Sequence, residues 1–315
     1  MSQATRTPPT VGAAEHTETT RLRRRGRLGR EQALLGPVFI APAMILFFLF
    51  VLLPAGAALV LSFHAYDILN PAEWVGLANY RRLLDDTIFH RALRNIVAYC
   101  VLYVPTTIAI ALAVALALNR RAPGVRLFRM IYYMPVVTSL VAASTVWTWL
   151  LHKDFGPINQ LLGYVGIDGP AWLSDSDTAL LAIVLVTVWQ GIGGNMVVYL
   201  AGLKGVPTYL YEAARLDGAG PWQTFRDITW PSLRTTTLFV VTMTLIGSFQ
   251  LFDQAYVMTQ GGPGYATTTP VYAIYQSGFN RLQMGYASAQ AFVLFLVILA
   301  VTVINLRANR EHVAV

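Results

Sequence analysis

The sequence predicts an all-α integral membrane protein with six transmembrane helices. The chain of 315 residues is 55% hydrophobic and only 12% charged, whereas charged residues make up about a quarter of an ordinary soluble domain. Six apolar stretches can cross about 30 Å of hydrocarbon, a distance that takes roughly 20 helical residues. They are Pro37–Phe63, Ile96–Leu118, Met130–Leu151, Ala179–Leu203, Thr235–Phe252 and Ala287–Leu306. Helices are expected because backbone polar groups in lipid must be bonded within their own segment.

The positive charges predict which connecting loops face the cytoplasm, because cytoplasmic loops of membrane proteins are enriched in Lys and Arg. Of the 23 Lys and Arg residues, all but six fall in the N-terminal tail, the second and fourth loops, or the C-terminus. The six exceptions are Arg81, Arg82, Arg91, Arg94, Lys153 and Arg281. Both termini and the fourth loop are therefore expected in the cytoplasm. Membrane topology explains the basic balance, and no nucleic-acid partner is needed.

Three regions follow from this order. Residues 1–35 form a basic cytoplasmic tail that is expected to be disordered, because it has few large apolar residues. Residues 36–306 carry the six spans, and residues 307–315 form a short cytoplasmic tail. A basic segment before an apolar run is also typical of a signal peptide. Pro37–Phe63 is too long for a cleavable core, so we interpret it as a retained span.

The fourth loop, from Pro207 to Thr237, has the most informative local pattern. Thr208 is placed to cap a helix, with Glu212 one turn further on. Asp217-Gly218 and Gly220 break that helix, and Pro221 suits the first position of a second one, which Pro231 then closes. The pattern predicts a helix-turn-helix elbow with a small, polar tip, held between two membrane spans.

Most loops between membrane helices are only connections, but this one carries a specific pattern. In order, it contains Glu212-Ala213-Ala214, Asp217-Gly218-Ala219, Phe225, Ile228-Thr229 and Pro231-Ser232-Leu233. The pattern resembles the EAA loop of ABC-importer permease subunits, in the form of the carbohydrate branch typified by the first permease of maltose-type and glycerol-phosphate-type systems. Two features depart from that form. Trp230 stands where an aliphatic residue is usual, and Thr replaces the Pro often found soon after Pro-x-Leu.

Two outer loops carry a second resemblance to the same family. The segment Trp74-Val75-Gly76-Leu77-Ala78-Asn79-Tyr80, followed by Phe89 and Leu93-Arg94-Asn95, resembles the segment that leads into the second span of these permeases. Met258-Thr259-Gln260-Gly261-Gly262-Pro263-Gly264, followed by Thr267-Thr268, resembles their Thr-x-Gly-Gly-Pro loop. A Gly-Gly-Pro-Gly run alone indicates only a tight turn. The resemblance covers about Gly36 to Leu306.

The resemblance implies a type I ABC-importer permease that forms half of a translocation pathway for a sugar or related polyhydroxylated solute. In that family the loop, here residues 204–234, sits in a cleft of a separate ATPase. The coupling residues carried over to this sequence are Glu212, Ala213, Ala214, Asp217, Gly218 and Gly220. The implied partners are a second, related permease forming a heterodimer, two copies of the ATPase, an extracytoplasmic solute-binding protein and membrane lipid. The implied location is the inner (plasma) membrane of a prokaryote.

The sequence lacks the residues that catalysis or cofactor binding would need. A Walker-type phosphate loop requires Gly-Lys-Ser/Thr, and neither Lys153 nor Lys204 follows a glycine. The five histidines have no metal-ligand spacing, and Cys100 is the single cysteine. We therefore expect no enzyme activity, no metal and no cofactor on this chain, with ATP-Mg bound by the partner ATPase.

Polar residues within the spans are candidates for the solute path. Gln190, Asn195 and Gln250 lie in or at the end of apolar runs, where a polar side chain is costly unless it faces a cavity or a partner. Their amides could replace water around a polyhydroxylated solute, or they could bond neighbouring helices together. Both interpretations stay open. Trp147, Trp149 and Trp189 could stack on sugar faces, although interfacial anchoring is the commoner role of membrane Trp.

The alternative function is a stand-alone secondary transporter or channel for a small polar solute. Ion coupling would need a carboxylate within the membrane, and the six predicted spans contain none. Asp253, at the edge of the fifth span, is the nearest candidate. A membrane-anchored scaffold would leave the cluster of amides and glycines unexplained.

Overall fold

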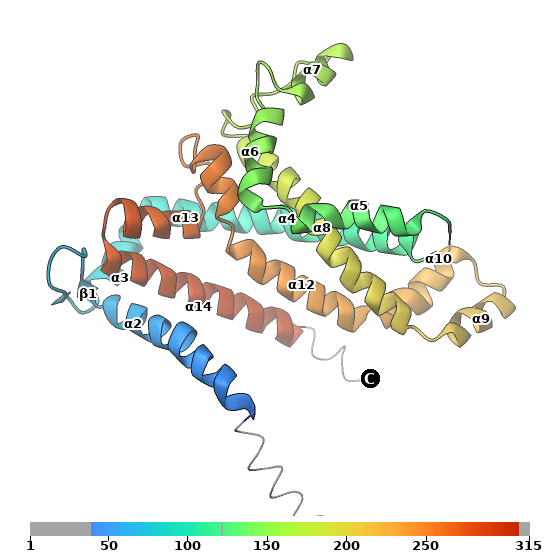
Figure 1. The fold of residues 1–315 in the computed structure, drawn as a ribbon, viewed down its shortest axis with the longest axis horizontal. Coiled ribbons are helices and arrows are strands. Elements are labelled where there is room, and N and C mark those ends of the chain that lie inside the picture. Colours follow the sequence, from blue (N-terminus) through green and yellow to red (C-terminus); the bar gives the residue numbers. More distant parts are fainter. Residues whose placement is uncertain (1–38, 121, 309–315) are drawn as a thin grey trace, which may run out of the picture. The chain divides into compact units, whose positions relative to one another are not determined.

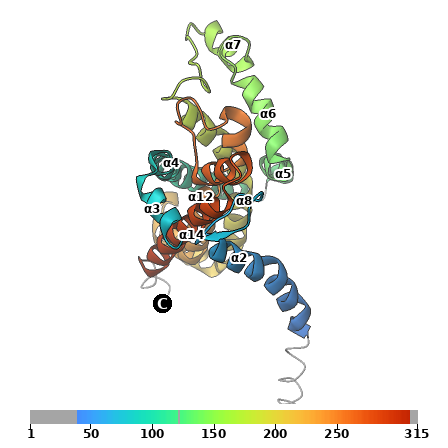
Figure 2. The ribbon, with the colours of Figure 1, turned by 90° about the vertical axis from the view of Figure 1, so that its left-hand side faces the viewer.

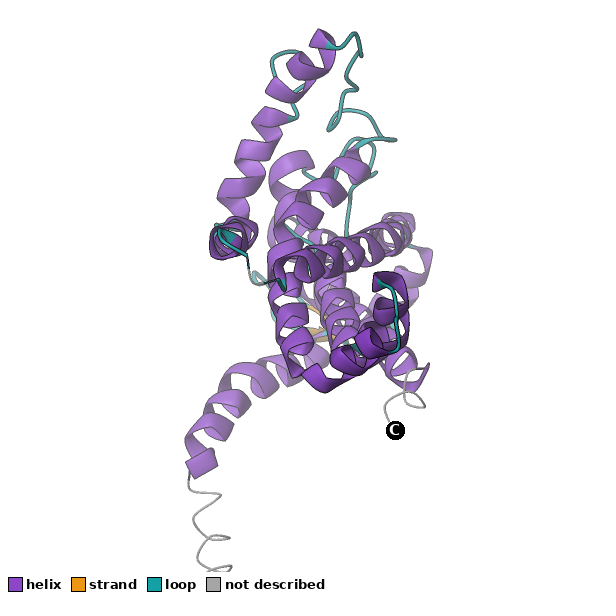
Figure 3. Ribbon diagram, turned by 90° about the vertical axis from the view of Figure 1, so that its right-hand side faces the viewer, coloured by secondary structure: helices purple, strands orange, loops and turns teal. Residues whose placement is uncertain are grey.

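The computed structural model describes residues 39–120 and 122–308 (Figure 1). The predicted tail of residues 1–35 and all but the first two residues of the predicted tail 307–315 lie outside these ranges. The chain divides into two units, one ending at Ala58 and the other beginning at Leu59. Helices dominate, and the strands of the described residues are the short antiparallel pair β1 (His64–Ala65) and β2 (Glu73–Trp74) (Figure 3).

The N-terminal described helix runs over Phe39–Leu61 and includes the π-helical turn η1 (Phe48–Leu52) and α2 (Leu53–Leu61). Pro54 is the second residue after the π turn, where the extra residue accommodates a proline that cannot donate a backbone hydrogen bond. No side chain of η1 or α2 is buried. A long apolar helix with this exposure is typical of one covered by lipid.

The second unit is built from helices of very different length. In chain order they are α3 (Ala78–Asp85), α4 (Thr87–Leu118), α5 (Val125–Val137), α6 (Leu140–Leu150), α7 (Pro157–Tyr164), α8 (Ala179–Gly205), α9 (Thr208–Leu216), α10 (Pro221–Thr224), η2 (Phe225–Thr229), α11 (Trp230–Ser232), α12 (Arg234–Phe249), η3 (Ala255–Thr259), α13 (Pro270–Tyr275), η4 (Gln276–Asn280) and α14 (Met284–Ala308). The elements named η are π-helical turns.

The core of this unit forms where α4 packs along α8, and α12 packs against both. Its largest fully buried side chains include Tyr199, Ile183 and Met196 from α8 and Ile96 from α4. On the other side of α8, Gly193 allows α5 to approach closely. A Cβ at this position would collide with the backbone of α5. Helix α14 runs beside α12, whereas α6 and α7 extend away from the rest of the unit (Figures 1 and 2).

The six predicted spans are confirmed only in part. Within the described residues, four helices are long and apolar enough to cross a membrane, namely Phe39–Leu61, Thr87–Leu118, Ala179–Gly205 and Met284–Ala308. The other two predicted spans belong to bent helix pairs. Val125–Val137 meets Leu140–Leu150 at 99°, and Pro221–Ser232 meets Arg234–Phe249 at 66°. The chain therefore has four unbroken candidate spans, or up to six if each bent pair crosses as one.

The prediction of one continuous helix over Met130–Leu151 is wrong. Helix α5 ends at Val137, and Thr138 and Ser139 both have extended ψ angles, 147° and 129°. The Thr138 hydroxyl donates to the Pro135 carbonyl at 2.7 Å, so the side chain bonds an oxygen left free at the end of the helix. Pro135 alone would give a kink, but two extended residues after it turn the chain by a right angle.

The two loops that share family-like sequence are bonded into one cap. The Asn79 amide donates to the carbonyls of Ser62 and His64, both at 2.9 Å. The Asn95 amide donates to the carbonyls of Tyr265 and Thr268 at 2.8 and 3.0 Å. Each asparagine thus bonds two backbone oxygens that lie outside regular helices. These bonds give a physical reason for asparagine at both positions.

Asp86 connects the cap to helices α4 and α14. Its carboxylate accepts the N–H groups of Ile88 and Phe89 at the start of α4, each at 2.9 Å, and the hydroxyl of Tyr286 on α14. Burial alone would raise the pKa of Asp86, but these hydrogen bonds and Arg82 hold it below its usual range. The stabilisation is therefore present above about pH 4 and is lost as the pH falls through the lowered value.

We expect Asn95→Ala to destabilise the cap, because it leaves two backbone carbonyls without their donor. Loss of a partly buried donor costs about 1–3 kcal/mol, and each 1 kcal/mol lowers the Tm by about 2–4 °C in a protein of this size. The measurement is the thermal unfolding midpoint of the purified protein. Asn70→Ala is the matched control, since the Asn70 amide bonds only to exposed Asp67. An unchanged midpoint for Asn95→Ala would contradict the proposed bonding of the cap.

Candidate functional site

The predicted elbow is present. Its first arm is α9, whose N-cap lies one residue earlier than predicted. Pro207 is the N-cap, because it has an extended conformation (φ −60°, ψ 131°) and its carbonyl accepts the Leu210 N–H at 3.2 Å. Thr208, the predicted cap, is instead the first residue of the helix.

Gly218 ends the first arm, as the sequence predicted. It adopts a left-handed conformation with φ 74°. The Ala219 N–H donates to the Ala214 carbonyl at 2.9 Å, and the Gly218 N–H donates to the Arg215 carbonyl at 3.2 Å. This pair of bonds is the Schellman motif, in which the left-handed position favours glycine. No atom lies within 4 Å of the point where a Gly218 Cβ would stand. Backbone conformation, and not space, therefore requires glycine here.

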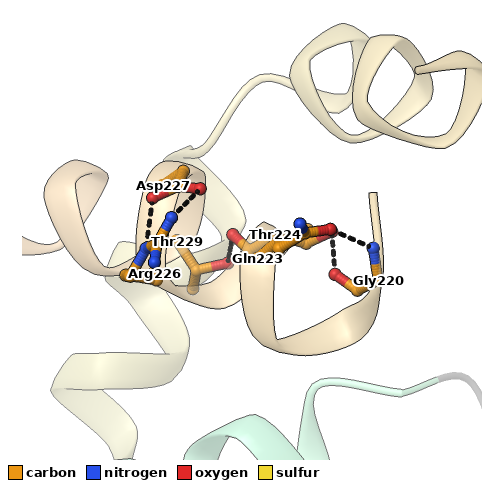
Figure 4. A network of polar contacts seen from close by, with 6 residues as sticks. All are labelled: Gly220, Gln223, Thr224, Arg226, Asp227 and Thr229. Atoms are coloured by element: carbon orange, nitrogen blue, oxygen red, sulfur yellow. Dashed lines mark hydrogen bonds and ion pairs between the residues drawn. The ribbon is translucent and has the colours of Figure 1, made fainter. Parts of the chain in front are cut away.

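The second arm begins at Gly220 and is held by its own polar contacts (Figure 4). The Gln223 side chain accepts the Gly220 N–H at 2.9 Å, and the Thr224 hydroxyl donates to the Gly220 carbonyl at 3.0 Å. The hydroxyls of Tyr211 and Thr229 are 3.2 Å apart and join the two arms. The elbow is therefore a bonded unit and not a loose connection.

The prediction that Pro231 closes the second arm is wrong. Helical structure passes through Pro231 and reaches Ser232 before the chain bends at Leu233. The π turn Phe225–Thr229 lies directly before Trp230 and Pro231, and the Trp230 N–H donates to the Phe225 carbonyl within it. The wider turn tolerates a proline that a regular α-helix would not.

Most of the predicted coupling residues lie on the surface of the elbow. Glu212, Ala213, Asp217 and Gly218 are exposed, Gly220 is half-buried and Ala214 is buried. Within residues 39–120 and 122–308, the Glu212 carboxylate has no ion-pair partner, in contrast to Asp227, which pairs with Arg226 at 2.7 Å. An exposed charge without a partner, on the first arm of the elbow, is available to another molecule.

Two exposed apolar residues on the same elbow were not predicted from the sequence. Leu216 is 89% exposed and Trp222 is 70% exposed, and they stand on either side of the glycine break. Each is a large apolar side chain exposed close in sequence to the predicted coupling residues. Their position next to Gly218 was the signal that could have identified them.

The three predicted solute-path residues come together in a second place. Gln190 and Asn195 from α8 and Gln250 from the end of α12 line one cavity of about 390 Å³. The cavity forms where α12 stops, because Gln250 (φ −95°, ψ 14°) ends the helix and Asp253 starts the next turn. Irregular backbone inside a membrane protein is tolerated where it lines a cavity.

Two of these three amide side chains form hydrogen bonds with other residues that line the cavity. The Gln254 amide donates to the Gln190 amide oxygen at 3.3 Å, and the Asn195 amide donates to the Thr244 hydroxyl at 3.2 Å. In this structure Gln190 and Asn195 thus hold helices together and also line the cavity. The two interpretations that the sequence left open are compatible.

Aromatic side chains form another wall of the cavity. Tyr99 and Tyr103 line it from α4, and their rings stack with centroids 5.1 Å apart. Phe252 lines it from the segment after α12. Tryptophans were candidates for this role from the sequence, but Trp147, Trp149 and Trp189 are not among the lining residues. Trp147 instead packs edge-on against Trp189, with centroids 5.5 Å apart.

The described residues contain no group of three His, Cys, Asp or Glu side chains that could hold a metal ion. The chemistry of the cavity is therefore that of amides, hydroxyls, aromatic rings and the Asp253 carboxylate. Groups of this kind bind a polar solute by hydrogen bonding and stacking.

Comparison with known proteins identifies the family. Residues 106–310 match the family described as the binding-protein-dependent transport system inner membrane component. The chain belongs to this family. The permease is therefore a transport component in a membrane and not an enzyme.

Similar proteins cover nearly the whole permease. It is 36% identical over 291 residues to the probable ABC transporter permease protein YesP of Bacillus subtilis, covering 91% of this chain and 94% of that protein. It is 35% identical to the lactose transport system permease protein LacF of Rhizobium radiobacter, with coverage of 91% and 98%. The crystal structure of a bacterial alginate ABC transporter, in complex with an alginate-bound periplasmic protein, contains a chain with the same fold (TM-score 0.79, 21% identity, coverage of 90% and 96%).

We expect Gly218→Leu to weaken the turn of the elbow, because a leucine in the left-handed conformation costs about 1–2 kcal/mol. Hydrogen exchange at the amides of residues 218 and 219 should become about 5- to 30-fold faster, as this free energy requires. Gly218→Asn should stay within about threefold of wild type, since asparagine tolerates this conformation.

Gly205→Leu is the matched control for added bulk. Gly205 is exposed, its φ is not positive and nothing lies within 4 Å of its Cβ position. Equal acceleration in Gly218→Leu and Gly205→Leu would show that the left-handed conformation is not what the turn depends on.

Proposed function

We propose that this permease is one half of the translocation pathway of an ATP-driven importer for a sugar or related polyhydroxylated solute. The observation that carries the proposal is the elbow, whose first arm exposes Glu212, without an ion-pair partner among the described residues, one helical turn from the apolar side chain of Leu216. Such a surface fits a cleft that offers basic groups and an apolar wall. A separate ATPase that binds ATP-Mg would supply this cleft.

Partners follow from the same proposal. A second, related permease would complete the pathway as a heterodimer, two ATPase copies would bind the two elbows, and an extracytoplasmic binding protein would deliver the solute. Relatives named as lactose and arabinooligosaccharide permeases support a carbohydrate. The distribution of Lys and Arg supports cytoplasmic termini. In this proposal each bent pair crosses the membrane as one span. The location would be the inner membrane of a prokaryote.

The connection between the elbow and the cavity supports alternating access. Helix α8 leads into the first arm and α12 leaves the second arm, and both helices line the cavity. Near the elbow the two helices are in close contact. Glycine at position 202 allows this, since a Cβ there would collide with Thr236 and Leu233. Movement of the elbow by the ATPase would therefore displace both cavity walls together, turning the cavity from one side of the membrane to the other.

We expect Glu212→Arg to disrupt binding of the ATPase, because a positive charge would face the basic groups that Glu212 pairs with. Loss of a buried charge pair costs about 2–5 kcal/mol, so retention of the ATPase should fall at least tenfold. The measurement is co-purification in detergent of this chain, its neighbouring permease and the ATPase, together with ATP hydrolysis by the complex.

Glu73→Arg is the control, since it reverses the charge of another exposed glutamate, in β2. Normal ATPase retention by Glu212→Arg would contradict the proposed role of the elbow. Solute movement by this chain in vesicles without any ATPase would instead favour the stand-alone transporter.

A further inference from the structure

The cavity has an unusual charge composition that the proposed function does not use. Among the described residues that line it, Asp253 is the single charged one. The other fourteen are uncharged polar, apolar or aromatic residues. The described residues therefore bring a carboxylate, and no basic side chain, to the cavity.

We propose that the cavity selects solutes that present hydrogen-bond donors, the hydroxyls of a neutral sugar or the ammonium of an amino sugar, and that Asp253 excludes solutes with carboxylate, sulfonate or phosphate groups. The inference rests on the proposed function and names the chemical class of the solute. It makes Asp253 a specificity-determining residue.

The hydrogen bonds of the cavity leave Gln250 and Asp253 free to contact a solute. Gln190 and Asn195 already bond to Gln254 and Thr244. Within the described ranges, the side chains of Gln250 and Asp253 have no hydrogen-bond or ion-pair partner, and both stand where α12 ends. An ionised carboxylate can only accept hydrogen bonds. A hydroxyl or an ammonium group satisfies it, whereas a second anion is repelled.

Two basic side chains of the neighbouring loops, Arg82 and Arg91, bond elsewhere. Arg82 donates to the Gln283 amide oxygen at 2.9 Å and lies over the Tyr286 ring, 4.1 Å from its centroid. Arg91 donates to the Gly264 carbonyl at 2.9 Å. Arg281 lines a different pocket, which also contains Asp86. None of these cations is among the lining residues of the cavity, so none compensates Asp253 there.

The aromatic wall favours the same class of solute. The faces of Tyr99, Tyr103 and Phe252 carry partial negative charge, which attracts C–H groups and cations and repels anions. Family membership does not decide this point, because one solved transporter with the same fold imports alginate, described as an acidic polysaccharide. The charge of the solute must therefore be inferred from the cavity of this chain.

A thiol at Gly247 can measure the electrostatic potential in the cavity. Gly247 lines it, and nothing lies within 4 Å of the point where its Cβ would stand, so Gly247→Cys adds a side chain without a clash. The native thiol is first removed as Cys100→Ser, which preserves the size of the residue and a partner for Ser248. The labelled protein is the full complex with its partner permease and ATPase.

The probes are two methanethiosulfonates of similar size, one bearing a trimethylammonium group and the other a sulfonate. The ratio of their rates at Gly247→Cys reports the local potential. One charge in a partly hydrated cavity, screened by salt, should change this ratio by about fivefold. We expect Asp253→Asn to lower the cation-to-anion ratio by about this factor, and Asp253→Lys to lower it further.

Gly163→Cys, on α7 and also without a Cβ contact, is the control site, and its ratio should not respond to Asp253. A ratio at Gly247→Cys that is unchanged by Asp253→Asn, or that favours the anionic probe in the presence of Asp253, would overturn the inference. The result is independent of ATPase binding. Failure of co-purification would thus count against the proposed function, and failure of the labelling ratio would count against this inference alone.

Discussion

The structure depends on one constraint, which is that backbone N–H and C=O groups away from water need a partner. Long helices satisfy it by themselves, so the informative places are where helices stop. At Gly218 the free carbonyls are bonded by a left-handed turn, and at Thr138 the side chain bonds the carbonyl of Pro135. In the cap, Asn79 and Asn95 each donate to two carbonyls. The end of α12 lies beside the cavity, where water or a solute can act as the partner.

Two helices connect the places where other molecules would bind. Helices α8 and α12 are consecutive long helices, separated by the elbow at one end and lined with amides and hydroxyls at the other. They approach closely at Gly202. In the proposed alternating access, these two helices carry a displacement of the elbow to the cavity.

The sequence was informative where a residue type had few alternatives. Gly218 was predictable because an Asp-Gly pair after a helical pattern is a typical helix end, and Gln190, Asn195 and Gln250 were predictable because amides avoid lipid. Tyr99 and Tyr103 were not, since a tyrosine in an apolar run is also an ordinary core residue. The bend after Val137 and the helix through Pro231 depend on two extended residues and on a π turn. Neither has a signal in hydropathy, and the partners of Asn95 lie too far along the chain to be inferred.

The hydrogen bond between Gln254 and Gln190 has a consequence for the rate of transport. Because the two amides already satisfy each other at 3.3 Å, a solute that reaches them exchanges one hydrogen bond for another and gains little net binding energy. Contact with this pair therefore adds little to the affinity for a solute, and weaker binding means a shorter residence time. A translocation pathway benefits from that property, because a solute that dissociates readily leaves the pathway free for the next one.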